Sequence, residues 1–237
     1  TAITAWIADE AAATATYGDI NTWDVRAITD FSGLFQNKAT FNSDISNWDV
    51  SSGTSFETMF AGATSFNQDI GGWNVSSGTN FYGMFYEADS FNKDIGSWNV
   101  GSGNNFYGMF YGANSFNQDI GSWDVGSGTN FGGMFANAEA FNQDIGSWDV
   151  SSGNSFYGMF ANADAFDQNI SSWQVSNTAT LTDMFSSADL MLSNLGFSST
   201  PTSADFNRTI FTDRNSLDAA ITAWIADEAA ATATYGD

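Results

Sequence analysis

Residues 116–140 read FNQDIGSWDVGSGTNFGGMFANAEA, and this stretch is one copy of a 25-residue unit that recurs through the chain. An isoleucine stands three residues before a tryptophan in every copy, and a valine stands two residues after it. A Met-Phe or Leu-Phe pair follows near the end of each copy. The tryptophans of seven successive copies keep the same spacing throughout, at Trp23, Trp48, Trp73, Trp98, Trp123, Trp148 and Trp173. This unbroken register predicts stacked units that supply one another's core, since no single unit can bury its own apolar face.

Each unit divides into two expected halves. The pattern Ile-x-x-Trp-x-Val predicts a short strand whose tryptophan and valine point inward, with the residue between them facing solvent. A Ser-x-Gly turn follows, in which glycines such as Gly78 and Gly128 are expected to supply either a positive φ or a close backbone approach. The pattern Thr/Asn-x-Phe-x-x-Met-Phe-x-x-Ala then places apolar residues on one face of a two-turn helix, with Thr or Asn as its N-cap.

We therefore expect an α/β repeat solenoid of the leucine-rich-repeat type, with seven 25-residue turns that each hold a short parallel strand and a short helix. An amphipathic helix within residues 1–19 is predicted to cap its beginning. The turns are expected to occupy residues 20–189. Residues 190–208, which include the only proline, are expected to form a C-terminal cap and linker.

A second, longer period appears at the end of the chain. Residues 220–237 repeat residues 2–19 without a single difference, at an offset of 218. Residues 209–237 are therefore predicted to be the start of a next tandem copy, and the chain to be one unit of a longer head-to-tail array. The junction between copies is expected to involve the apolar residues of the two helices, Trp6, Ile7, Leu217, Ile221, Trp224 and Ile225.

The charge balance limits the partners of the chain. It holds 27 Asp and Glu against 5 Lys and Arg, a formal net charge of −22. Nucleic acids and anionic membranes are bound through basic patches, so we expect neither as a partner. No apolar run approaches the roughly 20 residues that a membrane-spanning helix needs.

The absence of two residue types limits the catalytic and metal-binding chemistry that the chain can perform. The chain has no cysteine and no histidine. Disulfides and thiolate chemistry are thereby excluded, and the commonest general base and metal ligand is missing. Carboxylates are numerous, but they recur in regular columns, whereas a catalytic pair would be singular. We therefore predict that the protein is not an enzyme and requires no cofactor.

One column of carboxylates holds the only metal candidates, Asp44, Asp69, Asp94, Asp119 and Asp144. At the spacing of neighbouring strands, such charges repel by roughly 3–4 kcal/mol per pair at an effective dielectric of 20. Two arrangements would offset this repulsion. Each aspartate can accept backbone N–H groups in its own turn, or calcium can bridge the column, because it is a hard cation that binds oxygen ligands.

Two further polar columns run through the repeats. We interpret Asn42, Asn67, Asn92, Asn117, Asn142 and Asp167 as a ladder that satisfies backbone groups of the loops. The residue between Trp and Val forms an acidic strip, Asp24, Asp49, Asn74, Asn99, Asp124, Asp149 and Gln174. The acidic strip can be a binding surface for a sugar or a protein, or simply the solvated face of a sheet.

Tyrosines gather on the expected helical side, at Tyr82, Tyr86, Tyr107, Tyr111 and Tyr157. Tyr82/Tyr86 and Tyr107/Tyr111 are i, i+4 pairs in adjacent units, so four rings are expected to cluster. Exposed tyrosine clusters favour contacts with protein or carbohydrate. Partial burial between helices is the alternative. These residues are the candidate partner contacts.

The motif F-N-Q-D-I-G-S-W-D-V-x-S resembles the repeat of the BspA-like leucine-rich-repeat surface proteins of bacteria. The opening of residues 17–25, YGDINTWDV, is similar to the start of such domains, and the likeness covers roughly residues 1–190 and again 209–237. Where that family typically has S-x-V-T-x-M, this chain has S-x-G-T/N-x-F, as in residues 76–81, which suggests a compensated exchange of side chains. The resemblance implies a secreted or cell-surface protein concerned with adhesion, matrix or surface-layer structure, and it carries over no catalytic residue.

Two functions are consistent with these observations. The first is a non-enzymatic extracellular structural module, repeated at the longer period in a large surface protein or filament. The second is an adhesin-type binding module that recognises a glycan or a partner protein through the tyrosines or the acidic strip.

Overall fold

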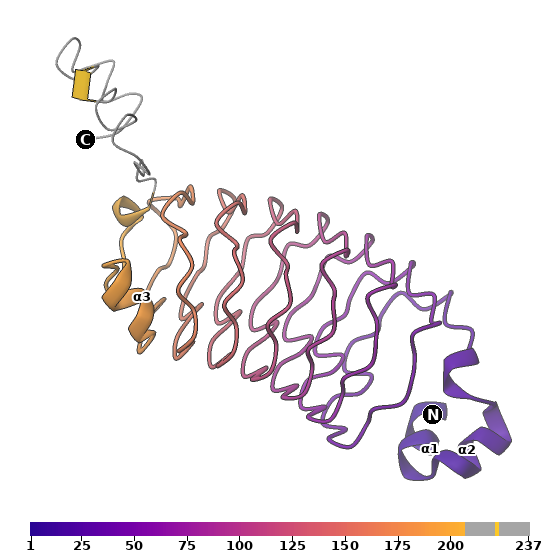
Figure 1. The fold of residues 1–237 in the computed structure, drawn as a ribbon. Coiled ribbons are helices and arrows are strands. Elements are labelled where there is room, and N and C mark those ends of the chain that lie inside the picture. The colour runs from indigo at the N-terminus through magenta and orange to yellow at the C-terminus, as the bar shows by residue number, and fades with distance from the viewer. Residues whose placement is uncertain (207–220, 223–237) are drawn as a thin grey trace.

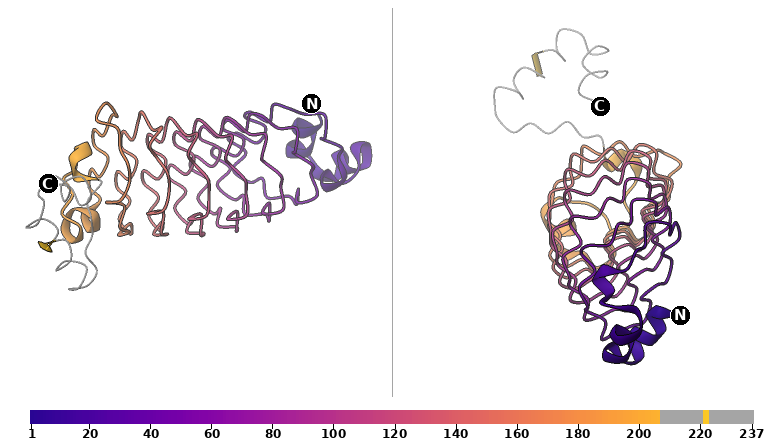
Figure 2. Two further views of the ribbon diagram at one scale, coloured as in Figure 1. Left: turned by 90° about the horizontal axis from the view of Figure 1, so that it is seen from above. Right: turned by 90° about the vertical axis from the view of Figure 1, so that its right-hand side faces the viewer.

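The chain winds through successive coils that lie one above another along a single axis, as the computed structural model shows (Figure 1). The structure describes residues 1–206 and 221–222. Helices α1 (Ala2–Ala8) and α2 (Glu10–Tyr17) lie at one end of the coils, and α3 (Asp189–Asn194) lies at the other. Two short 3-10 helices, η1 (Ile20–Thr22) and η2 (Ser203–Asp205), flank the coils. Seen along the axis, the coils overlie one another in one oval outline (Figure 2).

The parallel strand expected at Ile-x-x-Trp-x-Val does not form in the described repeats. Consecutive coils are instead joined by single parallel bridges after the Ser-x-Gly turn, at Asp30, Ser55, Asn80, Asn105, Asn130, Ser155 and Thr180. The reason is that the expected strand bends at both ends. The Trp48 N–H donates to the Ile45 carbonyl at 3.1 Å, and the Gly53 N–H donates to the Val50 carbonyl at 2.8 Å. Two turns so close together leave too few extended residues for a ladder.

The expected two-turn helix is also absent from the described repeats, where a chain of tight turns takes its place. In one coil, Met109 N–H donates to the Phe106 carbonyl at 3.1 Å, and Tyr111 N–H donates to the Gly108 carbonyl at 3.1 Å. Gly108 has a φ of 58°, in the left-handed region, and so cannot be part of a right-handed helix. A positive φ at the third residue of a turn is characteristic of type II turns.

The same positions of every coil take the left-handed conformation, and small or amide-bearing residues occupy most of them, as that conformation favours. The first position holds Gly33, Thr58, Gly83, Gly108, Gly133, Gly158 and Asp183, and the second holds Asn37, Gly62, Glu87, Gly112, Asn137, Asn162 and Ser187. The intervening N–H groups bond to the next coil, as Phe106 N–H does to the Asn130 carbonyl at 2.9 Å and Phe110 N–H to the Met134 carbonyl at 2.9 Å. Along this segment, backbone N–H groups that bond within the turns of their own coil therefore alternate with N–H groups that bond to carbonyls of the next coil.

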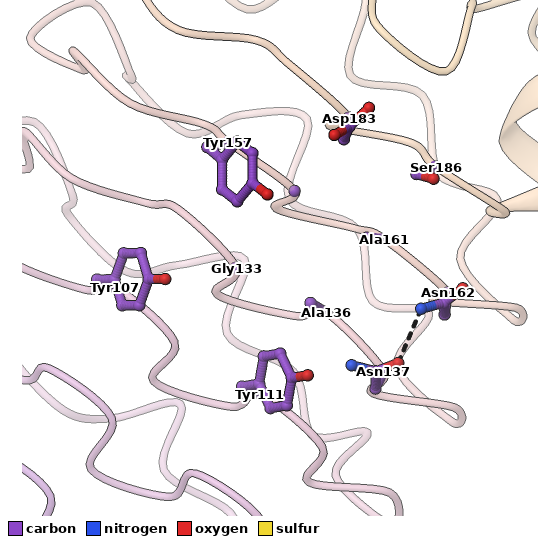
Figure 3. A pocket seen from close by; sticks show the side chains of 11 residues that line it. Tyr107, Tyr111, Gly133, Ala136, Asn137, Tyr157, Ala161, Asn162, Asp183 and Ser186 are labelled. Atoms are coloured by element: carbon purple, nitrogen blue, oxygen red, sulfur yellow. Dashed lines mark hydrogen bonds between the residues drawn. The ribbon is translucent and has the colours of Figure 1, made fainter.

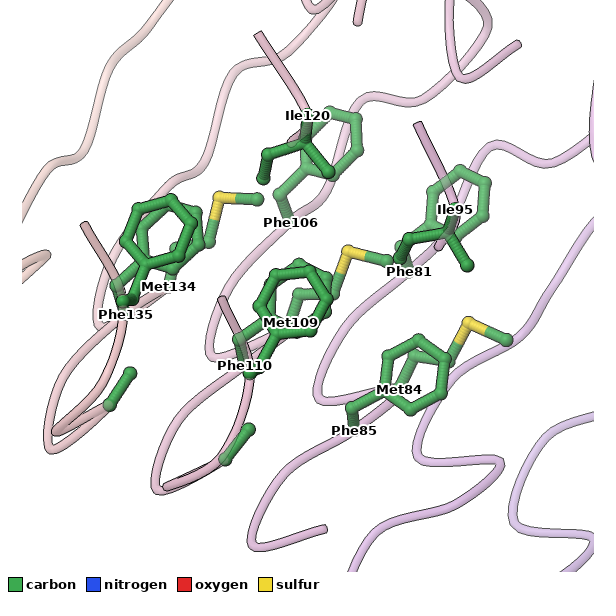
Figure 4. Close-up of a cluster of buried hydrophobic side chains, with 14 of the residues drawn as sticks. Phe81, Met84, Phe85, Ile95, Phe106, Met109, Phe110, Ile120, Met134 and Phe135 are labelled. Atoms are coloured by element: carbon green, nitrogen blue, oxygen red, sulfur yellow. The ribbon is translucent and has the colours of Figure 1, made fainter. Parts of the chain in front are cut away.

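Columns of identical apolar side chains fill the interior of the coils (Figure 4). Phe85 stacks on Phe110 of the next coil with ring centroids 5.6 Å apart, and Phe110 lies 4.0 Å from Phe116 of its own coil. Met109 and Ile120 are fully buried beside these rings. Each coil thus covers the apolar face of its neighbour, which is how a repeat array buries a continuous core.

The tryptophans add a bond between coils that the spacing alone did not predict. The Trp123 indole N–H donates to the carbonyl of Ile95 in the preceding coil at 3.0 Å, and this tryptophan is only 3% exposed. The same bond recurs from Trp48 to Trp173, with lengths between 2.7 and 3.2 Å. Each tryptophan therefore satisfies a buried carbonyl of the preceding coil while it fills the core.

The glycines of the Ser-x-Gly turn are required for close approach and not for a positive φ. A Cβ on Gly103 would lie 2.5 Å from the Phe106 ring and 2.9 Å from the Val100 carbonyl oxygen. The ring of the following phenylalanine occupies the space that a side chain at the glycine would need. This contact explains why Gly and Phe occur together here, and it agrees with the compensated exchange inferred from the sequence.

The N-terminal cap consists of two helices where the sequence predicted one. Asp9 interrupts the helix with an extended backbone and caps α2, because its side chain accepts the Ala12 N–H at 2.9 Å. Trp6 of α1 is 5% exposed, and its indole N–H donates to Ser43 Oγ at 2.9 Å. The Trp6 ring meets Trp23 edge to face at 5.7 Å. The cap is thus anchored to the first two coils.

The C-terminal segment that was expected to include a linker packs against the last coil instead. Phe185 N–H donates to the Ser199 carbonyl at 3.0 Å, and Asp183 N–H donates to Thr200 Oγ1 at 2.9 Å. Phe206 is only 2% exposed. This segment therefore takes the place of a further coil and closes the stack up to residue 206.

Candidate functional site

The aspartate column forms local hydrogen bonds. Each of the five carboxylates accepts the backbone N–H of the residue two positions later at 2.9–3.0 Å: Asp44, Asp69, Asp94, Asp119 and Asp144. This is the first of the two arrangements that the sequence allowed. Within residues 1–206 and 221–222, no group of three or more acidic side chains is placed to hold a metal ion.

The asparagine column is a continuous ladder, as predicted. The Asn117 side-chain oxygen accepts the Asn142 backbone N–H at 2.9 Å and the Gln143 Nε2 at 2.7 Å. The equivalent backbone bond joins all five steps from Asn42 to Asp167. From Asn67 onward the side chains are half-buried, so the ladder runs along the surface edge of the core.

The acidic strip is exposed, and most of its members bond their own turn. Asp149 accepts the Ser151 N–H at 3.0 Å, and the bonds from Ser151 hold the Asp149 pKa below its ordinary value. Asp24 pairs with Arg26 at 2.7 Å, and this bond lowers the Asp24 pKa to about 2. Arg26 and Asp24 form the one ion pair within the described residues.

The tyrosines form two stacked pairs across neighbouring coils. Tyr82 and Tyr107 have ring centroids 5.2 Å apart, and Tyr86 and Tyr111 have theirs 4.5 Å apart, with nearly parallel planes in both pairs. Burial, with smaller effects from Tyr111 and Glu87, raises the pKa of the Tyr86 phenol, which favours its neutral form. Tyr86, Tyr107 and Tyr111 are half-buried, whereas Tyr82 and Tyr157 are 38% and 49% exposed. The cluster therefore contains both exposed tyrosines, as expected of a contact surface, and partly buried ones, as expected of packing residues.

A groove of about 280 Å³ begins where the two tyrosine stacks end. In the next coil the positions of Tyr107 and Tyr111 are occupied by Gly132 and Ala136, and Tyr157 resumes the series one coil later. Tyr107 and Tyr111 line one side of the groove and Tyr157 lines the other (Figure 3). The missing side chains of the intervening coil thus create an opening between aromatic walls.

The floor and rim of the groove follow from the left-handed turns. Gly133 and Gly158 lie at the first left-handed position and leave the floor without side chains. Asn137 and Asn162, at the second left-handed position, place their amides on one side of the groove, and Asp183, at the first left-handed position of the last coil, adds a carboxylate to the lining. Asn162 Nδ2 donates to Asn137 Oδ1 at 2.9 Å, as Figure 3 shows. The tyrosine hydroxyls point toward the side on which these amides lie.

A protein-family model described as "Mycoplasma protein of unknown function, DUF285" matches residues 6–114 and 102–198. The chain belongs to the DUF285 family. This is a family of repeat-containing surface proteins of unknown function, and it is the family of the BspA-like repeat proteins. No curated protein and no solved structure matches the chain. No helix in the described part of the chain is long and apolar enough to cross a membrane.

The junction residues predicted in this DUF285 chain fall in two regions. Trp6 is buried in the N-terminal cap, and Ile7 packs partly buried against the core. Ile221 is 47% exposed. Leu217, Trp224 and Ile225 lie outside the described residues, and so does most of the predicted next copy.

Sequence reasoning singled out the tyrosines of this DUF285 chain but not the rest of the groove. The sequence pattern did not single out Ala136, Asn137, Asn162 and Asp183, which also line the groove. The aligned repeats do indicate the groove, because the positions equivalent to Tyr107 and Tyr111 hold glycine and alanine in the next repeat.

Proposed function

We propose that this DUF285 protein is a non-enzymatic structural module of an extracellular surface protein, repeated head to tail at the longer of its two sequence periods. The observation that carries the proposal is the identity of residues 220–237 with residues 2–19. The first copy of that sequence forms α1 and α2, which cap the first coils. An identical sequence is expected to cap the first coils of a following unit.

The two closed ends support an array of separate units. Trp6 covers the beginning of the stack, and Phe197 and Phe206 cover its end with 5% and 2% of their surfaces exposed. Capping repeats of this kind keep a repeat array soluble and stop it from growing coil by coil. We accordingly propose a repeat solenoid whose coils number seven per unit and whose units follow one another head to tail.

Electron microscopy of the full-length protein tests this proposal. We expect rods of one length, spaced at constant intervals along a thread. Limited proteolysis is expected to cut between the rods, because linkers between domains are the preferred sites of cleavage, and to yield fragments of one size and its multiples. Compact particles without periodic rods, or fragments of unrelated sizes, would contradict a tandem array.

The tyrosine-walled groove favours a second function, that of a binding module. A concave site with aromatic walls and a few convergent polar groups is the usual form of a ligand site. The wall residues Tyr107 and Tyr157 can be removed without touching the phenylalanine columns. Binding to glycan arrays or to candidate proteins that disappears in Tyr107→Ala and Tyr157→Ala would support this function, whereas unchanged binding would place the contact elsewhere, for example on the acidic strip.

A further inference from the structure

We propose that the groove between Tyr107, Tyr111 and Tyr157 binds a cationic side chain of a partner protein, with the arginine guanidinium as the best-matched group. The inference rests on the second proposed function, that of a binding module, and it names the chemistry of the partner. It does not depend on whether the unit is repeated in an array.

Charge complementarity is the first argument. The chain carries a net charge of −22, so its field concentrates cations and repels anions. Asp183 brings a carboxylate to the rim of the groove. The one ion pair within the described residues is that between Asp24 and Arg26, far along the chain, so no described basic side chain neutralises Asp183.

The aromatic walls are the second argument. Cations are attracted to the faces of aromatic rings, and arginine more often than lysine takes this position. Tyr107 leans over Gly132, since a Cβ there would lie 3.0 Å from two of its ring carbons. Tyr157 is 49% exposed on the opposite side of the opening. A planar guanidinium can therefore lie on one ring while its edge remains free for hydrogen bonds.

The hydrogen-bond acceptors in the lining of the groove are the third argument. A guanidinium carries five N–H donors and no acceptor, so it needs a site rich in acceptors. The groove offers the Asp183 carboxylate, the tyrosine hydroxyls, Ser186 and the asparagine amides. Asn162 Nδ2 donates to Asn137 Oδ1 at 2.9 Å, so these two amides are held side by side in the lining of the groove. A carboxylate accepts two parallel N–H bonds from arginine, a geometry that lysine cannot reproduce.

The test uses short amidated peptides, each with one central residue between glycines, and NMR spectra of the isotope-labelled chain. The central residue is arginine, lysine or citrulline, which has the shape of arginine without its charge. A methyl glycoside of a neutral pyranose is titrated in parallel. We expect the arginine peptide to shift the signals of Gly133 and Gly158 and to bind about tenfold more tightly than the citrulline peptide. High salt is expected to weaken this binding, because exposed charges are screened.

Ala136→Tyr is the decisive variant. It continues the stack of Tyr86 and Tyr111 by one ring and fills the groove without removing any wall residue. Ala61→Tyr is its matched control, since Ala61 occupies the same column at the other end of the tyrosine stack. We expect Ala136→Tyr to abolish arginine binding and Ala61→Tyr to retain it. Asp183→Asn and Tyr157→Ala, both at exposed positions, are expected to weaken binding about threefold to tenfold, so the test stands even if Ala136→Tyr fails to fold.

Equal binding of the arginine and citrulline peptides would overturn the proposal, and so would arginine binding that survives in Ala136→Tyr or in both exposed variants. Binding of the glycoside alone, sensitive to Tyr157→Ala, would overturn the arginine assignment and leave the binding function in place. If no probe binds, and no array or protein ligand depends on Tyr107 and Tyr157, both the assignment and the binding function are wrong.

Discussion

The interior of the coils and their tyrosine face follow the same 25-residue register but treat it differently. In the interior, phenylalanine, methionine, isoleucine and tryptophan recur almost without exception, and the phenylalanine rings stack on their copies in the next coil. On the tyrosine face, the series reads Tyr82, Tyr107, Gly132, Tyr157, Thr182. A column that holds the same residue in every coil produces close packing, whereas a column in which a small residue replaces a large one produces a concave surface.

The two regions are suited to different roles, the uniform interior to stability and the interrupted tyrosine face to recognition. A column that is identical in every coil presents no place that differs from any other, so it is suited to support and not to selective binding. The interruption at Gly132, between Tyr107 and Tyr157, occurs once in that series, and it coincides with the groove. Substitutions in the interior should therefore cost more stability than substitutions on the tyrosine face.

Removal of an interior ring is expected to have the largest effect. Phe110 is fully buried between Phe85 and Phe135, so Phe110→Ala should lower the free energy of unfolding by about 3–5 kcal/mol through lost burial and the cavity left behind. Tyr157→Ala, at a 49% exposed position, should cost less than about 1 kcal/mol. Urea denaturation followed by tryptophan fluorescence measures both. Equal losses would remove the distinction between the two regions.

Addition of one methyl group to the interior is expected to have the next largest effect. Gly103→Ala places a Cβ against the Phe106 ring and the Val100 carbonyl, and overpacking of this kind costs about 1–3 kcal/mol. Gly72→Ala is the control, because nothing lies within 4 Å of a Cβ at that position. Thermal unfolding should show a lower melting temperature for Gly103→Ala alone. A neutral Gly103→Ala would mean that the neighbouring ring moves freely, against the close packing described here.

Loss of one step of the asparagine ladder is expected to cost less. Asn117→Ala leaves the half-buried Asn142 N–H without its acceptor, at about 1–2 kcal/mol. Asn99→Ala removes an exposed bond to Gly101 N–H within one turn and should change stability by less than about 0.5 kcal/mol. Hydrogen exchange at the Asn142 amide should become faster only in Asn117→Ala. Protection of that amide in the variant would show that the ladder does not hold it.

Acid titration is expected to show the smallest effect. The folded-state pKa of Asp24 is about 2, below the ordinary value of about 3.9. Because the folded-state pKa is depressed, the ionised Asp24 side chain contributes to the free energy of unfolding above about pH 4. This contribution is lost as the pH falls toward 2. In Arg26→Gln, the Asp24 pKa should rise toward its ordinary value, as measured by NMR titration of the carboxyl carbon. An unchanged pKa would assign the shift to the turn N–H alone.

The 25-residue register and the buried residues of each repeat were predictable from the sequence, but the local conformation was not. The spacing of Phe106, Met109 and Phe110 suits one face of a helix, and it suits a chain of tight turns equally well. What separates them is Gly108, which sits inside the expected helix and adopts a left-handed φ. Glycine is unfavourable in helix interiors by about 1 kcal/mol, and its recurrence at this position argues for turns.

The candidate site was predictable only in part. The tyrosines stand out as large aromatic residues with a polar group that recur in register, and four of them form the two stacked pairs. The groove, however, depends on what is missing at Gly132 and Ala136 and on the left-handed turns that carry Asn137, Asn162 and Asp183. The missing tyrosines at Gly132 and Ala136 become visible only when each repeat is aligned with its neighbours.

The bonds between coils, such as those from Phe106 to Asn130 and from Trp123 to Ile95, run along the axis of the stack. A pull on the two ends therefore acts on one coil boundary at a time, and coils peel away in sequence. Each released coil adds one repeat of chain, or about 80–90 Å of contour length. In the tandem array that we propose, such units would lengthen in equal steps under tension and absorb mechanical work.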